Sequence, residues 1–387
     1  MISPYFVSKL GAPMNIVSLP GRNSGNPYID LFYDALAPHG IELVGQLQFE
    51  KQWFVDHLSE FDAIHLHWPE NLWRFYTNPT LKKLQQSDIR GTWRLSKFIE
   101  NSFRNHFANE SLQWLEDVLI YLKKENKKII WTWHNYEPHE DSNIQDIKGQ
   151  KILVQYANLI IFHSEYAETK CRENYNIQGK TIIMPHGNYD GVYPEPRDRD
   201  KVIAELGLIP DIPIVGMLGN IREYKGVDIA IDACAILGER VQFLCAGKPH
   251  STYDWGAIAE KASMLKHCAL VPRFINDQEF ADYTHVSDIV LLPYRNVTGS
   301  GALLSALTLG KGVVASDLPF FREVLGETPN AGILVESNDP NALAVAILNY
   351  LKVPANFRYC GARTLADNYS WDKVVSPVAR AFCHFLC

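Results

Sequence analysis

MLGNIREYKGVD, at residues 217–228, is an apolar strand, a polar turn and the start of a helix. Two later blocks repeat this plan: VLLPYRNVTGSGALLSALTLGKGVVASDLPFFREV at 290–324 and GILVESNDPNALAVAI at 332–347. Short apolar strands that alternate with helices predict parallel βαβ units with both faces of the sheet covered. Ligands bind such sheets at the carboxyl ends of the strands. The loops of these blocks are therefore the first place to seek a site.

The same alternation extends over most of the chain. In the first half, apolar runs predict strands at 15–19, 41–47, 63–67, 128–133 and 159–163, and helices at 28–37 and within 94–124. In the second half, strands are predicted at 214–218, 242–246, 269–272, 289–292 and 312–315. HGNYDGVYPEPRDR, at 186–199, lacks apolar periodicity and marks a boundary. We therefore predict an α/β protein of two Rossmann-like doubly wound domains, 1–188 and 189–368.

Composition excludes several classes of protein. The chain has 387 residues, 47% hydrophobic and 21% charged, with a formal net charge of −7. The negative charge argues against a general nucleic-acid binder. The seven cysteines form no CxxC pair, which favours reduced thiols in a cytoplasmic protein. The sequence shows neither a signal-peptide pattern at its start nor an apolar run of about 18 residues, so we expect no membrane span.

Two loops carry the residue types that hold a phosphate. In the first, Arg222 offers a planar fork of donors, and Lys225 offers a point charge near a helix start. In the second, two glycines allow close backbone approach and two hydroxyls can donate; the residues are Thr298, Gly299, Ser300 and Gly301. We predict that these six residues bind a diphosphate.

Together, these blocks resemble the nucleotide-sugar half of a GT-B glycosyltransferase, most closely family 4 (group 1). The resemblance implies two domains that face each other across a cleft, with the terminal helix of 369–387 crossing back to the first domain. It implies that the loop at Arg273 and Phe274 touches the nucleobase through its backbone. The glycine-rich loop of Gly21, Gly25 and Asn26 corresponds to the loop that lines the cleft.

The resemblance also points to candidates for the chemistry. The family's TxH strand end matches Thr132-Trp133-His134, so His134 is expected to contact the donor sugar. Glu70 ends the stretch FDAIHLHWPE, at 61–70, and lies just past the predicted strand, where it is a candidate general base. The loop of Glu137 and Glu140 supplies others, and the residues alone do not choose among Glu70, His134, Glu137 and Glu140.

One departure from the family concerns a carboxylate pair. Retaining family 4 enzymes usually carry Glu-x7-Glu around the second loop, but this chain has Val297 and Ser305 at those positions. Glu323 is a candidate replacement. The departure fits a divergent, inverting branch like the GDP-mannose β-mannosyltransferases. We therefore expect transfer of a hexose, mannose from GDP-mannose as the specific guess, to a saccharide or lipid-linked acceptor in exopolysaccharide or glycan synthesis.

A basic, aromatic segment at 73–107 suggests contact with a membrane surface. It contains seven Lys and Arg residues against two acids, together with several Trp and Phe residues. Such a composition suits peripheral docking at the inner, anionic face of a membrane, or an ordinary helix with a basic solvated face. No cofactor or metal is expected beyond the nucleotide sugar. The alternatives are a non-catalytic GT-B protein that binds a nucleotide sugar or a partner, and a nucleotide-sugar epimerase.

Overall fold

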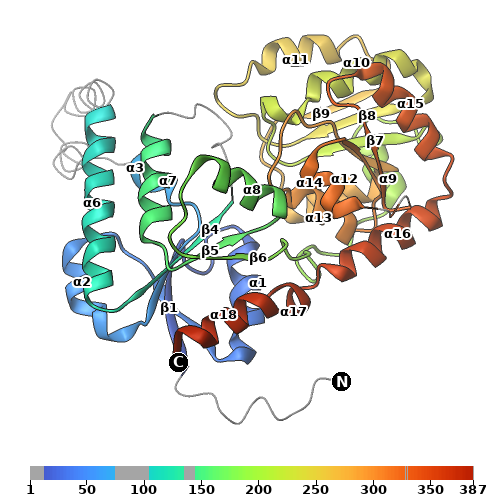
Figure 1. Ribbon diagram of the computed structural model, residues 1–387. Helices are drawn as coiled ribbons and strands as arrows, with labels where there is room; N and C mark the ends of the chain where they lie inside the picture. The colour runs from blue at the N-terminus through green and yellow to red at the C-terminus, as the bar shows by residue number, and fades with distance from the viewer. Residues whose placement is uncertain (1–12, 75–103, 135–143, 327, 329, 387) are drawn as a thin grey trace, which may run out of the picture. The chain divides into compact units, whose positions relative to one another are not determined.

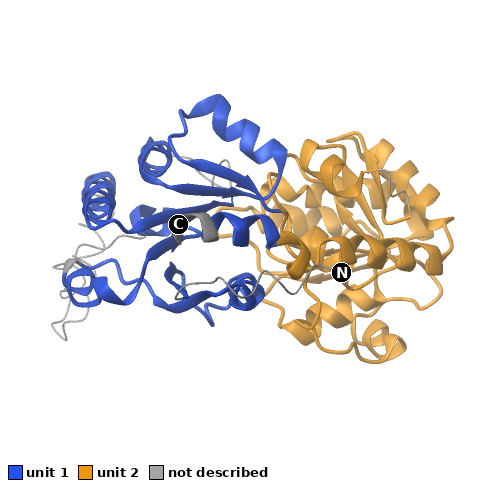
Figure 2. Ribbon diagram, turned by 60° about the horizontal axis from the view of Figure 1, so that its bottom comes forward, with its two compact units in different colours: residues 1–184, 375–387 blue, residues 185–374 orange. Residues whose placement is uncertain are grey.

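The computed structural model describes residues 13–74, 104–134, 144–326, 328 and 330–386. The chain forms two compact units, coloured separately in Figure 2. Unit 1 comprises Met1–Met184 and Val375–Cys387, and unit 2 comprises Pro185–Val374. Unit 1 is thus assembled from two separate segments of the chain, whereas unit 2 is continuous.

Unit 1 is built on a six-stranded parallel sheet (Figure 1). Its strands, in spatial order, are β2 (Ile41–Gln46), β1 (Met14–Leu19), β3 (Ala63–Leu66), β4 (Lys128–Trp133), β5 (Leu159–Phe162) and β6 (Lys180–Ile183). All four residues of β5 are buried, as are all four of β3. Burial on both faces explains why these strands read as continuous apolar runs.

Helices cover both faces of this sheet. Trp131 and Trp133 of β4 join a core with α6 (Arg104–Lys124) and α7 (Ile144–Tyr156). Thr132 lies between them in sequence and points to the opposite face, where it bonds His65 beside α1 (Pro27–Leu36). Among the described residues, the remaining α-helices of unit 1 are α2 (Lys51–His57), α3 (Glu70–Arg74), α8 (Glu165–Asn174) and α18 (Ser376–Leu386), of which α18 contacts β6.

Unit 2 repeats the plan. Its parallel strands, in spatial order, are β12 (Gly332–Val335), β11 (Val313–Ser316), β10 (Ile289–Leu292), β7 (Ile214–Leu218), β8 (Gln242–Ala246) and β9 (Cys268–Val271). One core packs α10 (Val227–Leu237) and α15 (Pro340–Leu351) on the sheet, and another packs α9 (Arg199–Glu205) and α12 (Asp277–Val286). The other helices are α11 (Trp255–Ala262), α13 (Gly301–Thr308), α14 (Pro319–Leu325), α16 (Ala355–Asn368) and α17 (Trp371–Val374).

The predicted fold class is confirmed: both units are doubly wound α/β sheets. The predicted strands at 128–133, 214–218, 242–246 and 289–292 have the observed bounds. Those at 269–272 and 312–315 are shifted by one residue, and the others differ by one residue at one end. Two details differ from the expectation. Strand β6 was not predicted, because KTII at the sheet edge is exposed or half-buried throughout. The terminal helix is interrupted, since α17 ends at Val374 and α18 begins at Ser376.

Candidate functional site

The loop after β7 is shaped by two glycines and tied to the end of β8. Gly219 and Gly226 have φ angles of 93° and 69°, which glycine adopts without strain. The N–H of Ile221 donates to the Lys248 carbonyl, and the N–H of His250 donates to the Ile221 carbonyl, both at 2.9 Å. The loop is therefore anchored before the chain enters α10.

Arg295, from the loop after β10, holds the same loop from another side. Its backbone N–H donates to the Tyr224 carbonyl at 2.7 Å. Its guanidinium donates to the Glu223 carbonyl at 2.7 Å and to the Asp228 carboxylate at 2.6 Å. Arg295 therefore acts as a clamp that joins the loops after β7 and β10, and its charge is compensated within the protein.

Lys225 ends the turn Glu223–Lys225 and lines a small pocket at the ends of β7, β8 and β10. Its Nζ lies 5.9 Å from the centre of the Tyr294 ring. Burial, together with the nearby charge of Arg222, lowers the pKa of Lys225 to about 8. Among the described residues, no carboxylate lies within ion-pair distance of its ammonium. A half-buried cation without a counter-ion, close to a second cation, is suited to bind an anion.

Gly226, directly after Lys225, should tolerate no side chain. A Cβ there would lie 2.2 Å from the Pro293 carbonyl oxygen, and its φ is left-handed. We expect Gly226→Ala to destabilise the protein by roughly 2–4 kcal/mol, through backbone strain plus the clash. Gly207→Ala is the matched control, because its φ is 68° and its Cβ would meet nothing within 4 Å; it should cost about 1 kcal/mol. Urea unfolding measures both, and equal losses would contradict the clash.

The loop after β10 leads into α13 through a capped start. The Ser300 hydroxyl accepts a hydrogen bond from the Leu303 N–H at 3.2 Å, and α13 begins at Gly301. A Cβ on Gly301 would lie 2.7 Å from the Tyr189 hydroxyl oxygen, so glycine permits this close packing. Thr298 and Gly299 immediately precede the cap. The first amides of α13 provide the positive end of a helix, which favours an anion.

Neither position of the expected carboxylate pair carries a charge. Val297 and Ser305 are both buried. The Ser305 hydroxyl lies 2.9 Å from the Tyr193 hydroxyl, so a neutral pair occupies the place of the second carboxylate. Glu323 is exposed on α14. Burial raises the pKa of the Tyr369 hydroxyl, and the nearby charge of Glu323 raises it further.

In the predicted nucleoside-binding loop, the Arg273 side chain is ion-paired and the Phe274 side chain is exposed. The Arg273 guanidinium donates to both carboxylate oxygens of Glu279, at 2.5 and 2.9 Å, and its pKa is raised by this pairing. The Phe274 side chain is 71% exposed. Of the two, Phe274 is the side chain that a flat ring can reach without breaking an ion pair.

In unit 1, the loop after β1 ends in a helix cap. The Asn26 side chain accepts a hydrogen bond from the Tyr28 N–H at 3.1 Å and so caps α1. Gly25 has a φ of 81° and open space at its Cβ position, whereas a Cβ on Gly21 would lie 2.6 Å from Gln46. Arg22, in the same loop, pairs with Asp34 at 2.7 Å. Gly25 and the N-terminus of α1 are therefore open to a ligand, whereas Gly21 is buried.

Three histidines directly follow three adjacent strands of unit 1, and they form a chain. His67 Nδ1 lies 3.3 Å from His134 Nε2, and His134 Nδ1 lies 3.3 Å from His163 Nε2. His163 Nδ1 lies 2.9 Å from the Met184 carbonyl oxygen. The described residues contain no group of three or more His, Cys, Asp or Glu that could hold a metal ion. The rings are thus bonded to one another, and both nitrogens of His134 are engaged.

Aromatic rings enclose this histidine chain. Trp68 stacks on His134, with ring centres 4.2 Å apart, and the Tyr28 ring presents its edge to His67, His134 and His163. The His67 pKa is well below its ordinary value, because burial removes the charged form from water and because other histidines lie nearby. His67 therefore sits in an environment that favours its neutral imidazole.

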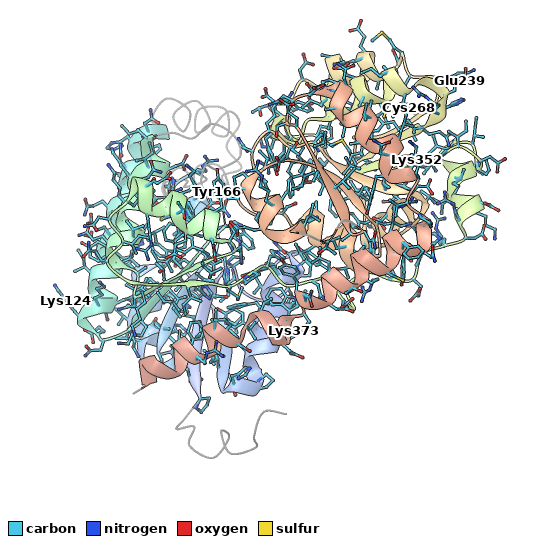
Figure 3. The ribbon with its side chains drawn as sticks, turned by 45° about the vertical axis from the view of Figure 1, so that its right-hand side comes forward. Lys124, Tyr166, Glu239, Cys268, Lys352 and Lys373 are labelled. Carbon is cyan, nitrogen blue, oxygen red and sulfur yellow. The ribbon has the colours of Figure 1, made fainter. Side chains whose placement is uncertain are left out.

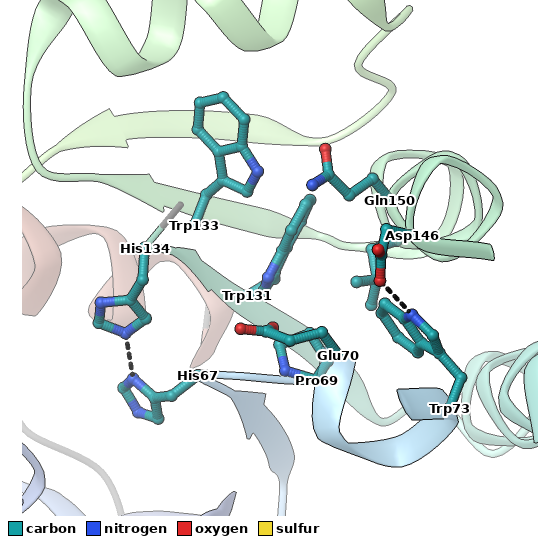
Figure 4. A pocket seen from close by; sticks show the side chains of 10 residues that line it. His67, Pro69, Glu70, Trp73, Trp131, Trp133, His134, Asp146 and Gln150 are labelled. Carbon is teal, nitrogen blue, oxygen red and sulfur yellow. Dashed lines mark hydrogen bonds between the residues drawn. The ribbon is translucent and has the colours of Figure 1, made fainter. Parts of the chain in front are cut away.

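Glu70 and His67 both line a small pocket (Figure 4). The pocket is lined by Trp73, Trp131, His134 and Asp146 among others, and its volume of about 20 Å³ admits roughly one water molecule. Burial raises the Glu70 pKa to about 7, although its own backbone N–H and the Arg74 charge oppose the shift. A carboxyl group that titrates near neutral pH suits proton transfer.

Asp146 holds the walls of the pocket together. Its carboxylate accepts hydrogen bonds from the Trp73 indole at 2.8 Å and from the Arg74 guanidinium at 2.9 and 2.7 Å. In Figure 4 the Trp73 ring turns toward Asp146. This bidentate pair joins α3 to α7 and fixes the helix whose first residue is Glu70.

Some predicted features lie outside the described residues. Glu137 and Glu140 fall within 135–143, and most of the basic, aromatic segment falls within 75–103. No described helix combines the length and apolar character that a membrane crossing requires.

Sequence reasoning did not single out His163 or Asp146. His163 carried a usable signal, since AIHLH, IIWTWH and LIIFH all end an apolar strand on histidine. Adjacent parallel strands place such residues at one edge of the sheet. Asp146 carried none, because nothing in its local sequence indicates a partner in α3.

Comparisons with known proteins follow the fold and the loops. Residues 212–352 match the family model described as glycosyl transferases group 1. The chain is 23% identical over 304 residues to the GDP-mannose:glycolipid 4-beta-D-mannosyltransferase of Xanthomonas campestris pv. campestris, covering 76% of this chain and 71% of that protein. It is 26% identical over 195 residues to a D-inositol 3-phosphate glycosyltransferase of Xylanimonas cellulosilytica, covering 48% of this chain and 46% of that protein.

Solved structures share the whole architecture. Sucrose-phosphate synthase from Thermosynechococcus elongatus aligns with a TM-score of 0.66 at 18% identity, covering 97% of this chain and 99% of that one. Anabaena HepE in complex with UDP and glucose aligns with a TM-score of 0.66 at 16% identity, covering 96% and 100%. At these identities the similarity establishes the fold.

Proposed function

Since this chain is a group 1 glycosyltransferase with the GT-B fold, we propose that it transfers mannose from GDP-mannose to a saccharide or lipid-linked acceptor. The place of such a reaction is exopolysaccharide or glycan synthesis. The mannosyltransferase named above supports the choice of donor, since it matches over about three quarters of this chain. Its name also specifies a glycolipid, which supports the lipid-linked acceptor.

The observation that carries the proposal is the ammonium of Lys225. When the glycosidic bond breaks, negative charge builds on the diphosphate, and a cation placed there lowers the barrier. Lys225 is half-buried, lies near Arg222 and has no carboxylate partner among the described residues. The first amides of α13 add fixed positive charge without a mobile ion. These groups together would stabilise the leaving diphosphate.

In unit 1, Glu70 is the best candidate for the base. Transfer requires that the acceptor hydroxyl lose its proton while its oxygen bonds to the sugar C1 and the bond from C1 to the diphosphate breaks. A carboxylate with a pKa of about 7 can take that proton at neutral pH. The neutral Val297 and Ser305 support an inverting course, because that course asks for no carboxylate in the donor loop.

Thermal unfolding with added nucleotides tests the donor. GDP should stabilise the protein by several degrees at saturating concentration, and UDP, ADP and dTDP should do so less. A larger shift with UDP would replace guanine by uracil in the proposal. Absence of a shift with all four would refute a nucleoside diphosphate site.

Turnover in vesicles tests the acceptor. We infer that the basic segment at 73–107 brings the enzyme to the anionic inner face of a membrane. GDP release from GDP-mannose should then be faster with a polyprenyl-linked saccharide in phosphatidylglycerol vesicles than in phosphatidylcholine vesicles. Equal rates would count against membrane docking, and faster release with a free oligosaccharide would count against the lipid-linked acceptor.

A further inference from the structure

The histidine chain has a direction, and its fixed end is His163. A backbone carbonyl only accepts hydrogen bonds, so the 2.9 Å contact with Met184 requires that His163 carry its proton on Nδ1. In the neutral ring, Nε2 of His163 is then an acceptor. The ring is buried, and Ser164 beside it caps α8, so its orientation is held by the fold. The contact with Met184 therefore determines which nitrogen of His163 faces His134 as a lone pair.

The tautomer of His163 determines that of His134. His134 Nδ1 faces the His163 lone pair at 3.3 Å and so must donate, which leaves His134 Nε2 as the acceptor. His67 Nδ1 then donates to His134 Nε2 at 3.3 Å. When all three rings are neutral, they share one tautomer, with the proton on Nδ1. His67 Nε2 ends the chain as a buried atom without a hydrogen-bond partner.

The two bonds between rings are weak enough to exchange. Both are 3.3 Å long, whereas N–H donors usually lie about 2.9–3.0 Å from their acceptors. The bond from His163 to Met184 is of ordinary length. His134 is also less buried than either neighbouring ring. A hydroxyl group that reaches His134 can therefore replace His67 as the donor to Nε2 without disturbing His163.

We propose that His163 is a positioning residue: by holding His134 in the Nδ1–H tautomer, it leaves His134 Nε2 as an acceptor to which a hydroxyl of the saccharide substrate donates. This role rests on the proposed transferase function for its substrate, but the tautomer does not. The contact with His163 fixes the proton of His134 on Nδ1, so that Nε2 presents a lone pair to the substrate.

Nitrogen-15 NMR of the histidine side chains tests the tautomer in the unliganded protein. At pH 8, above the ordinary imidazole pKa of about 6.5, His134 should show a protonated Nδ1 and an unprotonated Nε2. Loss of its signals in His134→Gln assigns them. A proton on His134 Nε2 in the wild type would overturn the proposal.

Two amide variants separate positioning from packing. His163→Gln places an amide oxygen near the Nε2 position and can still accept from His134, whereas His163→Asn reaches only the Nδ1 position and the Met184 carbonyl. His163→Asn should therefore release the His134 tautomer and lower kcat/KM for GDP-mannose by roughly 10- to 100-fold. His163→Gln should retain both the tautomer and most of the activity. Circular dichroism confirms that each variant is folded.

The outcomes distinguish this proposal from the donor assignment. If both amide variants lose activity equally while the His134 tautomer is unchanged, His163 has a packing role and the proposal fails. If the wild type releases no GDP from GDP-mannose, the donor assignment fails, and the NMR result alone then decides whether His163 sets the tautomer.

Discussion

Lys225→Ala should lower turnover of the nucleotide-sugar donor by roughly 10²- to 10³-fold, the effect of removing one preorganised charge from a leaving group. It should also abolish stabilisation by GDP, because the half-buried ammonium is the cation of the pocket after β7. The rate of GDP release measures the first effect, and thermal unfolding with and without GDP measures the second. Turnover within twofold of the wild type would remove Lys225 from the site.

Lys352→Ala is the matched control. Lys352 lies exposed at the end of α15, on the surface of unit 2 (Figure 3), and its replacement removes the same charge from the same unit. It should leave both turnover and GDP binding unchanged. A similar loss in this variant would mean that net charge, and not the position of Lys225, attracts the nucleotide.

The pKa of Lys225 gives this prediction a pH dependence. In the free protein the ammonium loses its proton near pH 8, whereas in the unfolded chain its pKa is about 10.4. GDP binding should therefore weaken as the pH rises above 8, and Lys225→Ala should show no such decline. Between these two values the unfolded chain binds more protons, so the stability of the unliganded protein should rise with pH there.

Glu70→Gln should lower kcat by roughly 10²- to 10⁴-fold, the range for loss of a general base. In the wild type, kcat should rise with pH through about 7, because Glu70 must be ionised to accept a proton. The variant should lack that rise. Glu110→Gln, on the exposed surface of α6, is the control and should keep the wild-type profile. A wild-type profile without a group near pH 7 would argue against Glu70 as the base.

The same substitution should make the protein more stable. Burial raises the Glu70 pKa from 4.5 to about 7, so between these values the folded state binds more protons than the unfolded state. The stability contributed by protonated Glu70 is present below pH 4.5 and is lost as the pH rises through 7. At pH 8 this loss amounts to roughly 3 kcal/mol, and Glu70→Gln should recover it in urea unfolding. A destabilised variant would indicate that ionised Glu70 has a favourable partner.

The fold was predictable because its strands are buried on both faces. Runs such as IVGML in β7 and LIIF in β5 are entirely apolar, so their positions are visible without tertiary information. Strand β6 lacks this signal, since it lies at the sheet edge with half-buried residues. Lys225 was predictable for a similar local reason, as strand, turn and helix follow one another within twelve residues of sequence.

What could not be predicted depends on contacts between distant residues. The role of Arg295 is one example, because its guanidinium pairs with Asp228, 67 positions away in the sequence. Two hydrogen-bond partners of His163 are 21 and 29 positions away, at Met184 and His134. Only the folded sheet shows that the two nitrogens of His134 are already in use. Features set by one strand–loop–helix segment could be predicted from the sequence. Pairings between residues of different segments could not.

The division of unit 1 into two chain segments has a consequence for synthesis on the ribosome. Residues up to Met184 emerge first, yet α18, which also packs on β6, lies after Val374 and emerges after all of unit 2. All of unit 2 is translated in between and can fold as a continuous domain. The first unit to be synthesised is therefore the last to be completed, and a released chain that ends before Ser376 contains all of unit 2 but a unit 1 without α18.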